Sequence, residues 1–180
     1  SAKKSFIFNH NNIDQFSTSK IKKFFFRNMN SAIRHLVYEY YIKQYLINEF
    51  NKIVEIISHP VPLNYESGVK KQFQIFSPSA GGRAYNSEIL LITSKIPDLK
   101  VFLKGDCAVA KNNYVIKPSY DNYFELLQNS AFVFVPVNYN YRVSGVVYEA
   151  LSNNCIVILL RSVLATELKQ RFPNEINIID

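Results

Sequence analysis

Glycine, cysteine and tryptophan are scarce or missing in this sequence. The chain has five glycines among 180 residues, no tryptophan, and no glycine before Gly68. Glycine is needed where the backbone takes unusual angles or comes close to a ligand. Because the glycines all lie beyond the first third of the chain, we expect two regions with different tasks. The length allows one domain or two small ones.

Long apolar runs and paired cysteines are also absent. No apolar run approaches the about 20 residues that cross a bilayer, and residues 6–8 are too short for the core of a signal peptide. Cys107 and Cys155 are far apart and form no Cys-x-x-Cys motif. We therefore expect two buried free thiols in a reducing compartment. No cluster of His, Cys and Asp has the spacing of metal ligands, so we expect no metal.

Acidic residues are missing from one stretch of the chain. No Asp or Glu lies between Gln15 and Tyr38, whereas basic residues recur there; the net charge of the whole chain is +7. Such a patch attracts anionic membranes, nucleic acids or acidic substrates. The basic residues are Lys20, Lys22, Lys23, Arg27 and Arg34.

Aromatic residues interleave with these charges in residues 20–29, where Ser17 or Ser19 is positioned to cap a helix over residues 20–30. A helix lying on a membrane surface has this composition. A solvated helix that turns its phenylalanines into the core has it too. RNA binding by aromatic stacking is a third, weaker interpretation.

Apolar strand-like runs alternate with helical periodicity, which predicts an α/β fold with a parallel sheet. Uninterrupted apolar strands such as residues 132–135 suit a sheet that is covered on both faces. The prolines at 60 and 62 break the pattern and predict a linker. We expect strands at 5–8, 35–38, 53–57, 73–76, 99–103, 114–116, 131–135, 156–160 and 176–179, and helices at 20–30, 42–51, 87–94, 120–129, 145–151 and 165–171.

Ligands of an open parallel sheet bind beyond the carboxyl ends of its strands. The most informative loop there follows the strand at 131–135 and ends at Ser144, Gly145 and Val146, which open a helix. The N–H groups and the dipole of a helix start bind phosphate well. Glu149 lies about one turn further and is positioned to accept hydrogen bonds from ribose hydroxyls. The alternative is a serine cap followed by an ordinary helical glutamate.

The order Val135-Pro136, Gly145, Glu149-Ala150 and then the strand at 156–158 resembles the donor-binding signature of retaining glycosyltransferases of the GT-B fold, the group 1 (glycosyltransferase family 4-like) family. Residues 56–62 resemble the linker between the two domains of that family. The resemblance implies a Rossmann-like parallel sheet with helices on both faces. It divides the chain into the end of an acceptor-side domain (1–58), a linker (59–68) and a truncated donor-binding domain (69–180).

The resemblance implies transfer of a sugar, with retention, from a nucleotide-diphospho-sugar to an acceptor hydroxyl. The expected partners are that donor and a saccharide or lipid-linked acceptor, with no cofactor, no metal and no nucleic acid. A peripheral membrane contact through residues 20–34 fits a cytoplasmic protein at the inner face of the membrane. The composition, rich in Asn, Ile, Lys, Tyr and Phe, is typical of an AT-rich genome and suggests bacterial cell-surface polysaccharide synthesis.

The resemblance also carries residue roles. Glu149 matches the glutamate that contacts the donor ribose, and Arg83 matches an arginine on the diphosphate. The first glutamate of the signature, which contacts the transferred sugar, falls at Tyr141. His10 follows a strand where the family often has a histidine near that sugar. The alternative for His10 is a histidine in a polar surface loop.

Several positions depart from the family pattern. The lysine that accompanies the arginine falls at Asn86, and the loop at 160–164 has no glycine. Together with Tyr141, these departures leave a second interpretation, a degenerate non-catalytic module that binds nucleotide-sugars or serves as a partner subunit. A third is an unrelated nucleotide-binding α/β domain.

Overall fold

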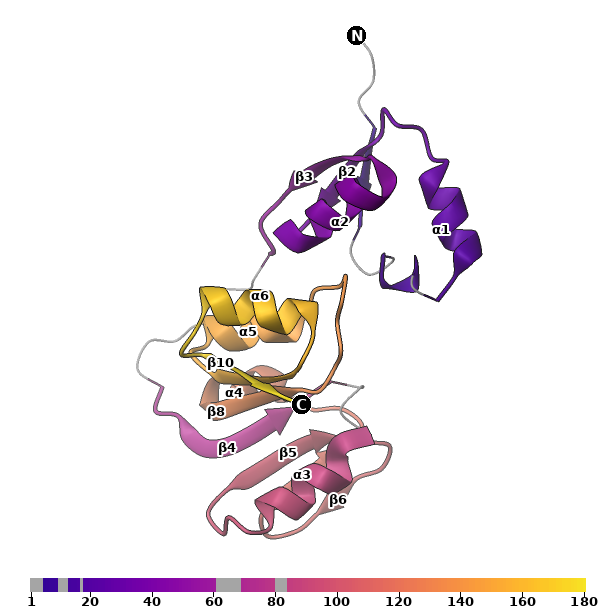
Figure 1. Cartoon of the computed structure of the whole chain (residues 1–180). Helices are drawn as coiled ribbons and strands as arrows, with labels where there is room; N and C mark the ends of the chain where they lie inside the picture. Colours follow the sequence, from indigo (N-terminus) through magenta and orange to yellow (C-terminus); the bar gives the residue numbers. More distant parts are fainter. Residues whose placement is uncertain (1–4, 10–12, 17, 61–68, 80–83) are drawn as a thin grey trace. The chain divides into compact units, whose positions relative to one another are not determined.

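The computed structural model describes residues 5–9, 13–16, 18–60, 69–79 and 84–180. His10, Arg83 and most of the expected linker lie outside these residues. The contacts divide the chain into two compact units, both drawn in Figure 1. Unit 1 comprises Ser1–Pro60 and Tyr139–Val143, and unit 2 comprises Val61–Asn138 and Ser144–Asp180.

Unit 1 contains a parallel sheet with the strand order β1-β2-β3. A helix follows each of the first two strands, as parallel neighbours require. The strands are β1 (Phe6–Phe8), β2 (Arg34–Val37) and β3 (Ile53–Ile56); the helices are the 3₁₀ turn η1 (Ile13–Phe16), α1 (Lys20–Arg27) and α2 (Tyr40–Phe50).

Aromatic rings form much of the core of unit 1. Phe26 of α1 packs against Phe16 of η1 and Phe50 of α2, with ring centroids 4.7 and 5.0 Å apart. His35 of β2 is buried beside them and its Nδ1 lies 3.0 Å from Nδ2 of Asn9. Burial, followed by the positive charge of Lys52, lowers the pKa of His35, so the ring is neutral in the folded core.

Unit 2 contains a seven-stranded sheet with the order β10-β9-β8-β4-β5-β7-β6. All neighbours are parallel except β6 and β7. The strand order reverses between β4 and β8, which is where open sheets of this kind bind ligands. The strands are β4 (Gln72–Ser77), β5 (Lys100–Lys104), β6 (Val109–Ala110), β7 (Tyr114–Lys117), β8 (Ser130–Val135), β9 (Ile156–Leu160) and β10 (Ile176–Ile179).

Helices lie on opposite faces of this sheet. Phe134 of β8 packs with Ile89 of α3. Phe76 of β4 packs with Tyr123 of α4, with ring centroids 5.6 Å apart. Phe76 and Phe134 point to different faces, because Phe76 is in register with Val133 and side chains alternate along a strand. The helices are α3 (Asn86–Thr93), α4 (Tyr123–Asn129), α5 (Gly145–Ser152) and α6 (Val163–Arg171).

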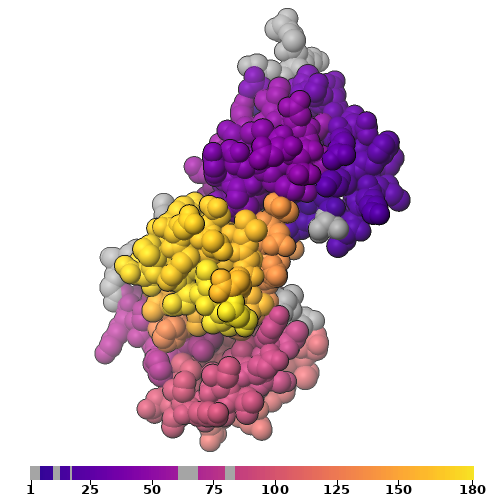
Figure 2. All heavy atoms as spheres, viewed as in Figure 1, coloured from indigo at the N-terminus to yellow at the C-terminus, as the bar shows by residue number. Residues whose placement is uncertain are grey.

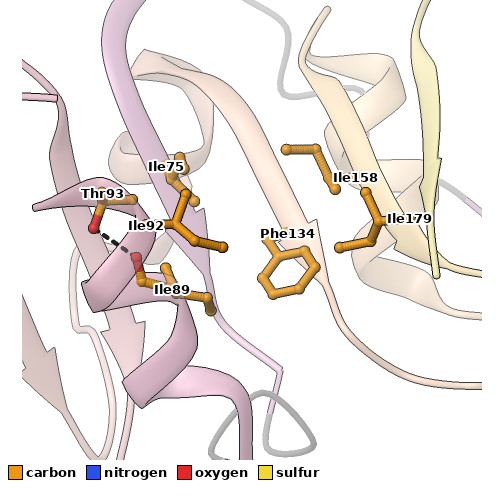
Figure 3. A pocket seen from close by; sticks show the side chains of 7 residues that line it. All are labelled: Ile75, Ile89, Ile92, Thr93, Phe134, Ile158 and Ile179. Carbon is orange, nitrogen blue, oxygen red and sulfur yellow. Dashed lines mark hydrogen bonds between the residues drawn. The ribbon is translucent and has the colours of Figure 1, made fainter. Parts of the chain in front are cut away.

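The α3 face of the sheet carries an apolar hollow of about 180 Å³ (Figure 3). Phe134 lies at its centre, between Ile92 of α3 and Ile179 of β10. Of its described lining residues, only Thr93 has a polar side chain, and its hydroxyl donates to the carbonyl of Ile89 at 2.7 Å. This described lining therefore offers no free polar group to orient a phosphate or a sugar.

The α/β class with parallel strands is confirmed. Of the two capping candidates for the basic helix, Ser19 caps α1 by accepting from the N–H of Lys22 at 3.3 Å, and Ser17 lies outside the described residues. Cys155 is buried as expected, but the expectation for Cys107 is wrong, because it is exposed. Cys107 follows the end of β5 in the turn before β6, a place that core packing does not reach.

Candidate functional site

The site begins at the N-terminus of α5, directly after the loop that follows β8. Ser144 is the N-cap residue and is extended, with φ −119° and ψ 114°. Its carbonyl accepts from the N–H of Val147 at 3.1 Å, but its hydroxyl makes no capping hydrogen bond. The hydroxyl of this serine therefore leaves the N–H groups of Gly145 and Val146, at the open end of the helix, without a side-chain cap.

Ser162, at the start of α6, shows the contrast. Its hydroxyl accepts from the N–H of Ala165 at 3.1 Å, so the serine satisfies its own helix start. This is the loop where the resemblance calls for glycine. Of these two helix starts, α5 is the one whose first-turn amides receive no hydrogen bond from the hydroxyl of the N-cap serine.

Glu149 folds back toward the first turn of its own helix. A β-carbon built on Gly145 would lie 3.9 Å from Oε1 of Glu149, which puts the carboxylate beside the glycine. Its Oε2 accepts a hydrogen bond of 2.5 Å from the hydroxyl of Tyr123 in α4. The pKa of Tyr123 is raised, chiefly by burial and then by this hydrogen bond and the charge of Glu149. Tyr123 is therefore a permanent donor that fixes the carboxylate.

This geometry selects among ligand chemistries. A carboxylate repels a phosphate held directly against it, but it accepts hydrogen bonds from hydroxyl groups. The amides of Gly145 and Val146 favour an anion. A ligand that suits both carries hydroxyl groups on one part and a phosphate on another, as nucleotides do.

The carboxyl end of β4 and the start of α3 supply further polar atoms, of which only Asn86 was noted in the sequence. The side-chain oxygens of Ser77, Ser79 and Asn86 are buried without a hydrogen-bond partner among the described residues, and Ser77 is only 1% exposed. Buried polar atoms are nearly always satisfied, so these oxygens are available as acceptors to a group outside the described residues. The only sequence signal was the position of Ser77 and Ser79 at the end of a strand.

Asn86 joins the start of α3 to the end of β5, and Gly105 follows that strand end at a place where β7 comes close. Nδ2 of Asn86 donates to the carbonyl of Lys104 at 3.1 Å. A β-carbon on Gly105 would lie 2.3 Å from Cγ2 of Ile116, so no larger residue fits there without movement. Asn86 thus has a structural bond through its amide nitrogen and an open acceptor at its oxygen.

Packing on β4 fixes the tyrosine that binds Glu149. The ring of Phe76 packs against the ring of Tyr123, which in turn donates to Glu149. The carboxylate is therefore positioned from the face of β4 that carries Phe76, whereas the side chain of the adjacent Ser77 points to the opposite face. Tyr123 was missed in the sequence, because 26 residues separate it from Glu149.

The structure brings four of the candidate site residues together, Ser144, Gly145, Val146 and Glu149, on the first two turns of α5. Arg83 and His10 lie outside the described residues, so their roles stay predictions. Residues 139–143 were assigned by sequence to the second domain, whereas their contacts group them with unit 1.

Tyr141 is held within unit 1. Its ring stacks on Tyr45 of α2, with centroids 3.8 Å apart and planes at 19°. Its backbone N–H donates to Oδ1 of Asp14 at 2.7 Å. Next to it, the carbonyl of Arg142 accepts from the hydroxyl of Tyr41 at 3.0 Å. These contacts give Tyr141 a packing role, and its predicted contact with a sugar stays a prediction.

Within the described ranges, no group of three or more His, Cys, Asp or Glu side chains is placed to hold a metal ion. No helix among the same residues has the length and apolar character to cross a bilayer. No protein-family model matches the chain, and the comparison with curated proteins finds no match.

Proposed function

We propose that the chain is part of a glycosyltransferase and that unit 2 binds its nucleotide-diphospho-sugar donor, as the donor-binding half of a GT-B fold does. The observation that carries this proposal is the carboxylate of Glu149, fixed by Tyr123 beside Gly145 at the open N-terminus of α5. The strand order supports it. When the six parallel strands of unit 2 are numbered 1 to 6 along the chain, from β4 to β10, their order across the sheet from β7 to β10 is 3-2-1-4-5-6. This is the order of Rossmann-like dinucleotide folds.

Each group at the site has a proposed task. The amides of Gly145 and Val146 hold the diphosphate, and Arg83 adds a positive charge to it, a role that rests on the resemblance alone. Glu149 accepts from the ribose hydroxyls through Oε1, the oxygen that Tyr123 leaves open. The reaction is transfer of the sugar with retention to the hydroxyl of a saccharide or lipid-linked acceptor. Positioning and stabilisation of the departing diphosphate lower the barrier.

Titration calorimetry of the 180-residue chain with UDP, GDP and ADP, each with and without an attached sugar, tests the proposal. We expect one base to bind, and Glu149→Gln to weaken its affinity about tenfold or more, the value of one hydrogen bond to a charged group. The matched control is Glu125→Gln, an exposed glutamate on α4, which leaves affinity unchanged. Equal affinity of the two variants, or no binding by the parent chain, contradicts the proposal.

The packing of Tyr141 favours a second candidate, a nucleotide-sugar-binding module without transferase activity. Tyr141 stacks on Tyr45 and donates from its N–H to Asp14, and as a tyrosine it has no carboxylate to contact the transferred sugar. The two candidates differ in one measurement, product formation by the full-length protein with the donor that calorimetry identifies. Sugar transfer supports the enzyme. Donor binding with neither sugar transfer nor hydrolysis of the donor supports the binding module.

A further inference from the structure

Helix α1 exposes most of its apolar side chains. Ile21, Phe24 and Phe25 are 71%, 63% and 67% exposed, whereas Phe26 is 5% exposed. The interpretation that the phenylalanines of this helix turn into the core therefore holds for Phe26 alone. The helix lies at the outer edge of unit 1 in Figure 1, and its atoms are at the surface in Figure 2.

The exposed apolar residues form one stripe. Successive residues of an α-helix are about 100° apart, so Ile21, Phe24 and Phe25 fall within an arc of about 100°. Phe26 points to the opposite side, into the aromatic core. The stripe is therefore an outward face of a helix whose inward face is already packed.

Basic residues border this stripe on both sides. By the same angular spacing, Lys20 and Arg27 lie along one edge and Lys22 along the other, and each is exposed. Lys23 lies nearer the core side, where its Nζ is 3.5 Å from Oε2 of Glu49. The helix itself has no acidic residue.

The helix is held firmly in this orientation. Besides the packing of Phe26, the buried Lys52 donates from Nζ to the carbonyls of Arg27 at 3.2 Å and Met29 at 2.8 Å. These bonds cap the C-terminal end of α1, where carbonyls have no partner in the helix. Ser19 caps the other end. The apolar stripe is therefore presented outward by a fixed scaffold.

We propose that α1 docks unit 1 on an anionic phospholipid surface. Ile21, Phe24 and Phe25 enter the boundary between headgroups and acyl chains, and Lys20, Lys22 and Arg27 lie on the anionic headgroups. An apolar stripe bordered by bases and free of acids is the composition of interfacial helices. This proposal concerns unit 1 and is independent of the donor site in unit 2.

Charge distinguishes this surface from the exposed apolar residues of α3. Leu91 and Ile92 of α3 are as exposed as the α1 residues, but the exposed charges beside them are the acidic Glu88 and the basic Lys95. An anionic bilayer therefore complements α1 better than it complements α3.

The test is co-flotation of the full chain with vesicles of phosphatidylcholine alone and of phosphatidylcholine mixed with phosphatidylglycerol. We expect binding to the mixed vesicles, little binding to the neutral ones, and weaker binding at high salt because the charges are screened. Phe24→Ser with Phe25→Ser reduces the partition coefficient more than about tenfold. Lys20→Gln with Lys22→Gln reduces it about 25-fold, since each basic residue near an anionic surface contributes about fivefold.

The matched control changes one exposed apolar and one exposed basic residue of unit 2, Leu91→Ser with Lys95→Gln. We expect this control to bind the mixed vesicles as the parent chain does. The α1 substitutions are at exposed positions, and circular dichroism verifies that the fold is retained. Absence of binding, equal binding to both vesicle types, or equal loss in the control overturns the proposal. If the parent chain binds no vesicles but forms a dimer that Phe24→Ser with Phe25→Ser abolishes, the stripe is a protein interface and the membrane proposal is wrong.

Discussion

Tyr123→Phe tests whether the carboxylate of Glu149 is held in place as the site requires. The change removes one hydroxyl, the donor of the 2.5 Å hydrogen bond to Oε2, and retains the ring that packs on Phe76. Hydrogen bonds to charged groups contribute about 1.5–3 kcal/mol. Because Glu149 is half-buried and water can replace the hydroxyl, we expect the lower end, a loss of about 1.5 kcal/mol in the unfolding free energy of unit 2.

A double-mutant cycle isolates this bond from other effects of the change. In a Glu149→Ala background the hydroxyl has lost its acceptor, so we expect Tyr123→Phe to cost only a few tenths of a kcal/mol. Native-state hydrogen exchange of the β8 amides reports the opening free energy of unit 2 by itself. Tyr123→Phe also weakens nucleotide affinity, since the carboxylate then samples other rotamers. If the losses from the two single changes simply add, Tyr123 does not position Glu149 and the account of the site is wrong.

Three further predictions follow from individual contacts. Gly145→Ala raises the unfolding free energy of unit 2 by about 0.5–1 kcal/mol, the difference in helix propensity, because the new β-carbon meets nothing closer than 3.9 Å. The same change weakens nucleotide binding, since the methyl group keeps the phosphate from the backbone. Hydrogen exchange measures the first effect and calorimetry the second. Gly105→Ala costs about 1–3 kcal/mol, since its β-carbon falls 2.3 Å from Cγ2 of Ile116; unchanged β8 exchange contradicts this. Unit 1 loses stability as the pH falls below 6.5, the ordinary pKa of histidine, because His35 takes up its proton more readily when unfolded than when folded. Hydrogen exchange of the β2 amides at several pH values measures this loss. We expect the pH dependence to disappear in His35→Leu.

Local pattern was enough to predict most of the elements of this fold. Buried parallel strands are continuous apolar runs, and β8 and β9 were predicted within one residue of their observed bounds. The two-residue strand β6 was missed because both its residues are exposed and only its pairing with β7 defines it. No local pattern in the sequence contains that information.

The same distinction separates the site residues that could be predicted from those that could not. Ser144, Gly145, Val146 and Glu149 belong to one helix, whose geometry fixes their spacing. Tyr123 joins them only through its hydrogen bond from α4 to Glu149 and its packing against β4. Tyr141 was assigned from its place in a motif, whereas its ring packs on Tyr45, a contact that depends on how distant parts of unit 1 fold together.

The proposed donor site depends above all on the N-terminus of α5, which we propose to bind the phosphate of a nucleotide. The most direct measurement is the nuclear magnetic resonance shift of backbone amides when the nucleoside diphosphate that binds best is added to the chain. We expect saturable shifts that are largest at Gly145 and Val146 and are reduced by Glu149→Gln. Shifts confined to other elements, or none at these two amides at saturation, would contradict it.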